Sequence, residues 1–232
     1  MRFMPITILG LIALTLTGCH QVASKNIPTE NMEANIRIVD DGSQIADIRA
    51  SLKLRDELFT YVDLSPGEGI FAYADGFRSS LIDTGFGYSG SVPTGNPLNE
   101  VQVSIERSHY ASAFDNFVTL PPAFELYVDY EPSEFGSDRI YIEWAQLSDD
   151  PMEIRIDGPC LFEYRAYVSR FGDDGLHRLS ADDLHFHNSW EGGTCAAEVI
   201  VERVRQGSLD PQLSGGEIEG VQMRRQTIYL YK

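Results

Sequence analysis

The sequence predicts an all-β protein built from antiparallel β-sandwiches, and two observations support this. Apolar residues recur at every second position, as in Val101, Val103 and Ile105, which places them on one face of a strand. Turn-forming pairs such as Asp75-Gly76 separate these runs, and the latter predicts a tight hairpin. Many short strands separated by turns about every 8–12 residues are typical of sandwiches, and we expect an immunoglobulin-like arrangement.

The chain begins with a predicted signal peptide, residues 1–18. Arg2 supplies a positive charge, and the apolar run at residues 6–17 is shorter than the roughly 20 residues of a membrane-spanning helix. Leu16-Thr17-Gly18-Cys19 then resembles the lipobox of bacterial lipoproteins. The resemblance implies cleavage before Cys19, diacylglycerol on its sulfur and acylation of the new N-terminus. An ordinary secreted protein with a stray thiol is the alternative.

The residue after the cysteine indicates the membrane. In lipoproteins of enteric-type bacteria an Asp at this position marks the inner membrane, and here it is His20. By that analogy the protein is attached to the outer membrane and faces the periplasm. Residues 19–33 are polar and lack apolar periodicity, so we expect an acylated cysteine followed by a short flexible tether.

The body divides loosely into an N-terminal β region, residues 34–112, and a C-terminal disulfide-bearing sandwich, residues 113–232. Residues 43–58 fit both a helix and a strand, and we favour the strand. The Gly-, Pro- and Ser-rich residues 83–99 are either a domain linker or a long loop within one sandwich.

The composition is strongly acidic. Asp and Glu number 35 against 18 Lys and Arg, for a formal charge of −17. A nucleic-acid-binding protein needs a basic patch that displaces counterions, so we expect no nucleic-acid partner. The membrane contact should come from the N-terminal lipid anchor rather than from charge.

Two cysteines remain after Cys19 is assigned to the anchor. An isolated pair in an oxidising compartment usually forms a disulfide, so we predict a bond between Cys160 and Cys195. A metal-binding or reactive thiol pair is the alternative.

Chemistry-bearing candidates are few. His185 and His187 are two positions apart, so on a strand both imidazoles would reach one metal ion, although two surface histidines would have the same spacing. Trp190, in a Gly-rich segment, is the candidate ligand-binding aromatic. Nucleophile-elbow, His-Glu-x-x-His and phosphate-loop motifs are missing from the sequence, so we lean against an enzyme and expect no cofactor.

The C-terminal half carries a second resemblance. Residues 117–127 (FVTLPPAFELY), 138–144 (DRIYIEW), Gly158-Pro159-Cys160 and 203–211 (RVRQGSLDP) are similar to a pattern in uncharacterised all-β lipoproteins of Gram-negative bacteria. That group has no assigned activity, so the resemblance implies an envelope location and no functional residue.

The sequence therefore favours a non-enzymatic, lipid-anchored envelope protein that binds a partner protein or supports assembly. A glycan- or peptidoglycan-binding module that uses Trp190 is one alternative. A metal-dependent hydrolase built on His185 and His187 is the other.

Overall fold

The fold is all-β, as predicted. A computed structural model describes residues 20–57, 59–95, 100–131, 139–168, 175–180 and 183–231. These residues form seventeen strands and two short 3-10 helices, η1 (Ser24–Asn26) and η2 (Thr29–Asn31). No helix in the described part is long and apolar enough to cross a bilayer. The predicted signal peptide and Cys19 lie outside the described residues.

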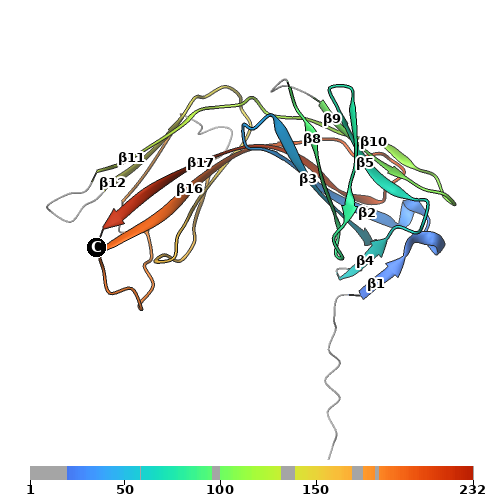
Figure 1. The fold of residues 1–232 in the computed structure, drawn as a ribbon, viewed down its shortest axis with the longest axis horizontal. Coiled ribbons are helices and arrows are strands. Elements are labelled where there is room, and N and C mark those ends of the chain that lie inside the picture. Colours follow the sequence, from blue (N-terminus) through green and yellow to red (C-terminus); the bar gives the residue numbers. More distant parts are fainter. Residues whose placement is uncertain are drawn as a thin grey trace, which may run out of the picture.

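One long sheet, sheet A, runs through the whole molecule and bends into an arch (Figure 1). Its strand order is β1 (His20–Ala23), β4 (Thr60–Asp63), β3 (Ile45–Leu54), β2 (Met32–Asp40), β17 (Gly215–Tyr231), β16 (Thr194–Gln206), β13 (Met152–Asp157) and β14 (Tyr164–Val168), with β8 (Tyr88–Pro93) and β7 (Ile82–Asp83) added beside β3. The prediction of purely antiparallel sheets is wrong here, because β17 pairs parallel with β2 and β1 pairs parallel with β4. The β17–β2 pair joins the two ends of the body, a contact that local hydrophobic patterns cannot reveal.

Two smaller sheets cover the convex side of the arch (Figure 1). Sheet B has the order β10 (Ala113–Thr119), β9 (Glu100–Glu106), β5 (Gly69–Ala74) and β6 (Phe77–Ser80). Sheet C has the order β11 (Leu126–Glu131), β12 (Arg139–Trp144) and β15 (Leu176–Ser180). We call sheet B with the part of sheet A beneath it the N-terminal lobe, and sheet C with its part the C-terminal lobe.

The parity of β17 explains why both lobes have their cores on the same side. Ile218 belongs to the N-terminal core, and Ile228 and Leu230 belong to the C-terminal core, so even-numbered residues face both small sheets. The odd-numbered residues therefore lie on the opposite, uncovered face. That face lines the concave underside of the arch.

Two local predictions are confirmed. Residues 45–54 of the ambiguous segment form strand β3. Asp75 and Gly76 connect β5 to β6 with φ angles of 50° and 79°, as a tight hairpin turn requires.

The loop predicted for residues 83–99 is wrong in part. Residues 88–93 form β8, which pairs with β3 and buries Tyr88 and Val92. The small residues of this strand resemble a loop in sequence. Gly90 is small for a packing reason, because a Cβ there would crowd Leu81 at 3.3 Å. Residues 113–119, which the predicted boundary assigns to the C-terminal sandwich, form β10 of the N-terminal lobe.

The flexible tether predicted for residues 19–33 is also wrong over the described residues. Strand β1 begins at His20 and pairs with β4, and the side chains of Ser24 and Thr29 are fully buried. The segment lacks apolar periodicity because polar bonds, rather than an apolar stripe, hold it in place.

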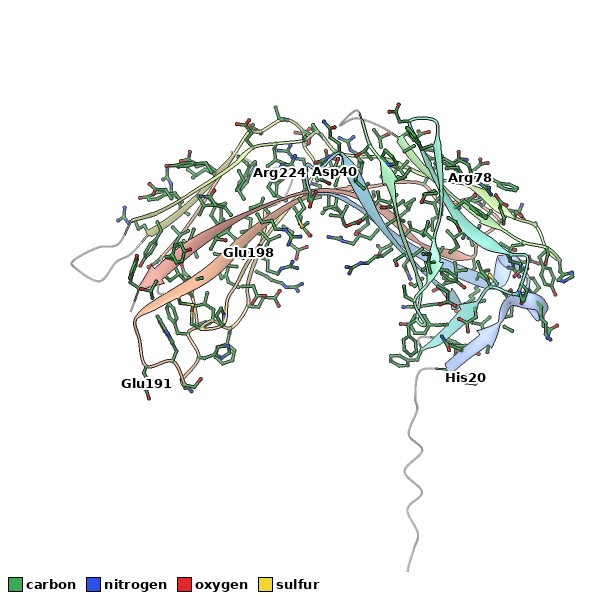
Figure 2. The ribbon with its side chains drawn as sticks, in the orientation of Figure 1. His20, Asp40, Arg78, Glu191, Glu198 and Arg224 are labelled. Atoms are coloured by element: carbon green, nitrogen blue, oxygen red, sulfur yellow. A yellow bond between two sulfur atoms is a disulfide. The ribbon has the colours of Figure 1, made fainter. Side chains whose placement is uncertain are left out.

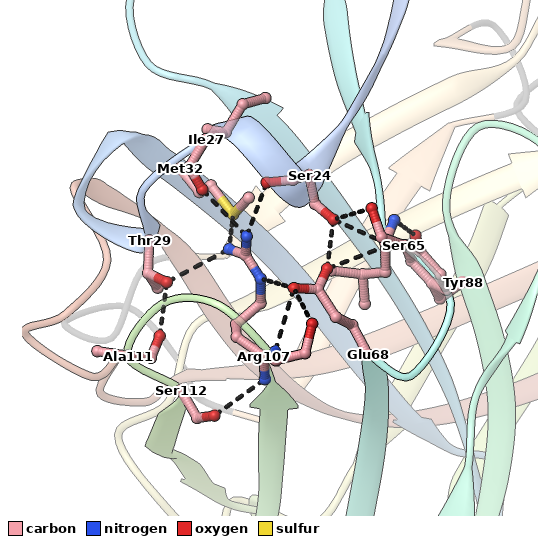
Figure 3. Close-up of polar contacts among 12 residues, drawn as sticks. Ser24, Ile27, Thr29, Met32, Ser65, Glu68, Tyr88, Arg107, Ala111 and Ser112 are labelled. Atoms are coloured by element: carbon pink, nitrogen blue, oxygen red, sulfur yellow. Dashed lines mark hydrogen bonds and ion pairs between the residues drawn. The ribbon is translucent and has the colours of Figure 1, made fainter.

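Those bonds converge on a buried ion pair between Arg107 and Glu68 (Figure 3). The Arg107 Nε atom lies 3.0 Å from a Glu68 carboxylate oxygen, and both side chains are fully buried. Arg107 also donates to the backbone carbonyls of Ser24 and Ile27, and the Ser24 hydroxyl donates to Glu68. Residues 20–31 are thereby fixed to the N-terminal lobe, and the folded body begins directly after Cys19.

Candidate functional site

The uncovered face of sheet A carries a groove that we take as the candidate functional site. The concave groove, about 450 Å³ in volume, is lined by Arg37, Val39, Asp47, Arg49, Glu153, Arg155, Arg165, Glu202, Met223 and Arg225. A second hollow of about 610 Å³ shares Arg37 and Arg49 with it and extends to Phe86 in the N-terminal lobe. The two hollows form one surface that runs along the underside of the arch.

Strand alternation places the arginines on this face. On β2, Ile36 and Ile38 point into the N-terminal core, so Arg37 and Val39 point to the concave side. On β13, Ile154 and Ile156 fill the C-terminal core, so Arg155 points to the concave side.

The strand register arranges these residues in rows that cross the sheet. Arg37 lies directly opposite Arg49, and Arg155 lies opposite Arg165. Like charges directly opposite one another destabilise a sheet, so two such pairs on one face need compensation.

Carboxylates supply part of that compensation. Arg37 pairs with Glu202 at 2.5 Å and with Glu219 at 2.8 Å. Although burial lowers the pKa of Arg37, these two carboxylates raise it above its ordinary value. Arg165 pairs with Glu163 at 2.8 Å and with Glu153 at 3.6 Å.

Between the arginine rows the groove has an acidic row and an apolar row. Glu202 pairs in register with Glu153 across β16 and β13. Next to them Val39 of β2 pairs in register with Val221 of β17. Both valines belong to a small apolar cluster that also contains Ile200 and Met223. The groove thus alternates basic, acidic and apolar bands over a short distance.

Arg49 and Asp47 are the groups of the groove that a ligand could use without breaking an existing bond. Both side chains are exposed, and neither forms an ion pair with any residue that the structure describes. A guanidinium presents a planar fork of donors that matches a carboxylate, and a carboxylate accepts from Lys, Arg or backbone N–H groups. The groove can therefore offer both a donor fork and an acceptor.

The predicted disulfide is confirmed, because Cys160 and Cys195 are bonded. Cys160 follows β13 and Cys195 lies at the start of β16, so the bond ties neighbouring parts of sheet A together beside the C-terminal core. Cys19, the predicted lipidation site, lies outside the described residues.

The predicted histidine pair lies next to this disulfide. The His187 backbone N–H donates to the Cys160 carbonyl at 2.8 Å, and the His187 ring packs on Phe162 with centroids 4.2 Å apart. His185 accepts a backbone bond from Phe162. Over the described ranges no group of three or more His, Cys, Asp or Glu side chains could hold a metal ion. The metal site at His185 and His187 stays a prediction.

Trp190, the predicted binding aromatic, is stacked on Phe186 with centroids 4.7 Å apart and is only partly exposed. It packs against the C-terminal core, in which Trp144 is buried.

Comparison with known proteins gives no further guide to the site. No protein-family profile matches the chain, and no curated protein sequence matches it.

Sequence reasoning missed the concave groove. One sequence pattern could have indicated it: an arginine between two apolar residues of a strand, as in Ile36-Arg37-Ile38 and Ile154-Arg155-Ile156. This signal identifies residues on polar strand faces but not which faces share one sheet, so the groove emerges only from the strand order.

Proposed function

We propose that the protein is a lipid-anchored lipoprotein of the bacterial cell envelope that binds a partner protein in its concave groove and has no catalytic role. The observation that carries the binding function is the groove itself. Five arginines line one short stretch of an uncovered sheet in a protein whose formal charge is −17. Two cross-strand arginine pairs cost folding free energy, and a binding role gives a reason for keeping them.

The mixed character of the groove favours a protein as the partner. A polyanion would be attracted by the arginines but repelled by Asp47, Glu153 and Glu202 in the same groove. A protein segment with both acidic and basic side chains and a central aliphatic residue complements all three bands. We therefore infer a partner segment of mixed charge, whose acidic group meets Arg49 and whose basic group meets Asp47.

The lipobox at Cys19 supports attachment to the membrane, and by the analogy at His20 we propose the outer membrane, facing the periplasm. Because β1 begins at His20, the anchor would hold the body close to the lipid surface without a tether between them. Figure 2 places His20 on the side toward which the arch opens. A partner in the groove would then lie near the membrane.

We also propose that the C-terminal lobe is an immunoglobulin-like sandwich. Sheet C faces β13, β16 and β17 over one core, and a buried tryptophan, Trp144, shares that core with the disulfide. Immunoglobulin domains also have a core tryptophan beside a disulfide, but their disulfide joins the two sheets, whereas Cys160–Cys195 lies within sheet A.

Two experiments test the proposed function. Cys19→Ala should move the protein from the membrane fraction to the soluble fraction without changing its melting temperature. A variant that stays in the membrane fraction would contradict the lipid anchor.

The groove is tested by photo-cross-linking in intact envelopes from a benzoylphenylalanine placed at Ser51, which lines the adjoining hollow on the same strand as Asp47 and Arg49. We expect one discrete adduct, which Arg49→Glu abolishes. Arg78→Glu is the matched control, since Arg78 is half exposed on the convex side of the arch (Figure 2) and should leave the adduct intact. Absence of an adduct, or equal loss in both variants with melting unchanged, would overturn the groove as a binding site.

The glycan-binding and metal-dependent hydrolase alternatives stay predictions. The stacking of Trp190 on Phe186 leaves less of its face for a sugar ring, and nothing in the described part of the chain adds a third ligand to His185 and His187.

A further inference from the structure

His20 and Gln21 contact two other segments of the chain at one end of the N-terminal lobe. The His20 backbone N–H donates to the Phe59 carbonyl at 3.1 Å, and the Gln21 side-chain amide donates to the Gly85 carbonyl. Figure 2 shows His20 at this end of the lobe. Residues 59 and 85 therefore lie next to the position where Cys19 joins the body.

This end exposes two large aromatic side chains. Phe59 is 63% exposed and Phe86 is 60% exposed. The Phe86 ring contacts the edge of Tyr61 with centroids 5.9 Å apart, and the Lys53 ammonium lies 5.6 Å from the Tyr61 ring centre. Exposed apolar side chains also occur elsewhere on this surface, as at Phe77. What distinguishes Phe59 and Phe86 is their position beside the proposed acylation site, where a lipid phase would be within reach.

The hairpin between β7 and β8 holds Phe86 in this exposed position. Thr84 donates its backbone N–H to the Gly87 carbonyl at 2.8 Å, and the Gly85 N–H donates to the Asp83 carboxylate at 2.7 Å. Gly85 has a φ of +97°, a conformation that favours glycine. The tip is a closed turn that presents the ring outward, so little conformational entropy would be lost if the ring entered another phase.

We propose that this end of the N-terminal lobe, through Phe59 and Phe86, inserts into the lipid interface beside acylated Cys19. The proposal rests on the lipid anchor proposed above. Anchored proteins with apolar side chains at the attachment end gain free energy by burying them at the boundary of headgroups and acyl chains. The net negative charge of the protein disfavours attraction to anionic lipid, so the contact is apolar and should not depend on anionic lipid content.

The lobe offers a matched control at its other end. Phe77 is 55% exposed and follows the Asp75-Gly76 turn. A Cβ on Gly95 would lie 2.9 Å from Asp75, and Gly95 follows the end of β8 opposite Phe86. Six residues of β8 span roughly 20 Å at ~3.3 Å per residue, so Phe77 should lie outside the reach of the lipid interface.

The experiment uses the full acylated protein reconstituted into phosphatidylcholine vesicles with brominated acyl chains. Phe59→Trp, Phe86→Trp and Phe77→Trp are compared by tryptophan fluorescence, each after subtraction of the parent protein, which contains Trp144 and Trp190. Interfacial rings lie about 5–10 Å into the headgroup and acyl boundary, so we expect quenching at least about threefold stronger at positions 59 and 86 than at 77. The melting temperature of each variant should equal that of the parent protein.

The outcomes separate this proposal from the anchor. Equal, weak quenching at all three positions in a protein that remains on the vesicles would overturn the membrane contact and leave the anchor intact. A protein with Cys19→Ala, Phe59→Ser and Phe86→Ser together that still fractionates with membranes would overturn the anchor, because neither the acyl chains nor the two rings could then hold it there. Quenching at positions 59 and 86 that appears only after anionic lipid is added to the phosphatidylcholine vesicles would overturn the apolar character of the contact.

Discussion

The two lobes share β17 and are closed over it by different means. The N-terminal lobe buries an ion pair, Arg107 with Glu68, that ties residues 20–31 to β5 and β9. The C-terminal lobe has a disulfide beside its core and uses the Gln226 side chain to bridge its two sheets.

The difference follows from what each lobe must hold. The N-terminal lobe fixes a largely polar segment in which Val22 and Ile27 pack on the core, and directional bonds from Arg107 and Glu68 hold the polar remainder. The C-terminal lobe fixes a three-stranded sheet whose apolar face already packs on sheet A. The Gln226 side chain adds one polar bridge between the two sheets, and the disulfide ties β16 to the end of β13 within sheet A. The lobe next to the proposed anchor is therefore the one whose stability should depend on charge.

Removing one partner of the buried ion pair should have the largest effect. Glu68→Ala leaves Arg107 as an uncompensated buried cation, and such changes cost about 3–5 kcal/mol. Hydrogen exchange measured at increasing denaturant concentration should show that residues 20–31 lose their protection first. Glu106→Ala, which breaks the exposed pair with Arg78, is the control and should leave the free energy of unfolding nearly unchanged, because water screens exposed pairs. Equal losses in both variants would contradict the special role of the buried pair.

Opening the disulfide should weaken the other lobe. Replacing Cys160 and Cys195 together with Ala removes a cross-link over a sequence separation of 35, for which the typical cost is about 2–4 kcal/mol. Hydrogen exchange should accelerate in β13, β14 and sheet C, while residues 20–31 keep their protection. Faster exchange confined to the N-terminal lobe would reverse the comparison.

Acid should weaken the N-terminal lobe through Glu68. Burial raises the pKa of Glu68, but hydrogen bonds from Ser24 and Arg107 outweigh it and lower the pKa from 4.5 to about 2. A lowered folded-state pKa contributes stability above the unfolded value, and that stability is lost as pH falls from about 5 to 2. The loss should be about 3 kcal/mol.

The acid effect is isolated by comparing the wild type with Glu68→Gln across this pH range. The variant is less stable at neutral pH, and its free energy of unfolding should fall less steeply with acid. Parallel pH profiles for the two proteins would argue against Glu68 as the titrating group.

The smallest effect concerns the bridge between the two sheets of the C-terminal lobe. The Gln226 side-chain amide accepts from the Val128 N–H and donates to the Val128 carbonyl, both at 3.0 Å. Gln226→Ala should cost about 1–2 kcal/mol and expose the Val128 amide to exchange. Gln226→Glu keeps the acceptor but loses the donor, so its cost should lie between wild type and Ala if each half of the bridge contributes.

Several features could be predicted from the sequence because their causes are local. Alternation identified strand residues such as Val101, Val103 and Ile105, and all three are fully buried. The Asp75-Gly76 pair specified its own turn. The disulfide joins cysteines 35 positions apart, and it was predictable because the sequence offers one pairing once Cys19 is set aside.

Other features could not be predicted, because they depend on contacts between distant segments. Residues 20–31 form a strand and two 3-10 helices, and their backbone carbonyls find a hydrogen-bond donor in Arg107, some 80 residues further along the chain. The strand at residues 88–93 has small residues that give no clear strand pattern, and it is defined by its pairing with β3.

The sequence by itself determined an all-β body, because strand alternation acts within a few residues, and it determined the disulfide, because two cysteines remain once Cys19 is set aside. The lipid anchor at Cys19 is a prediction from a short motif. The tertiary structure decided which polar strand faces come together. Arg37 and Arg155 are over a hundred positions apart in the chain, and they line one groove because β17 pairs with β2 on one side and β16 on the other. Pairing between distant strands depends on the packing of the whole sheet, so neither the arch nor the groove is visible in any local pattern.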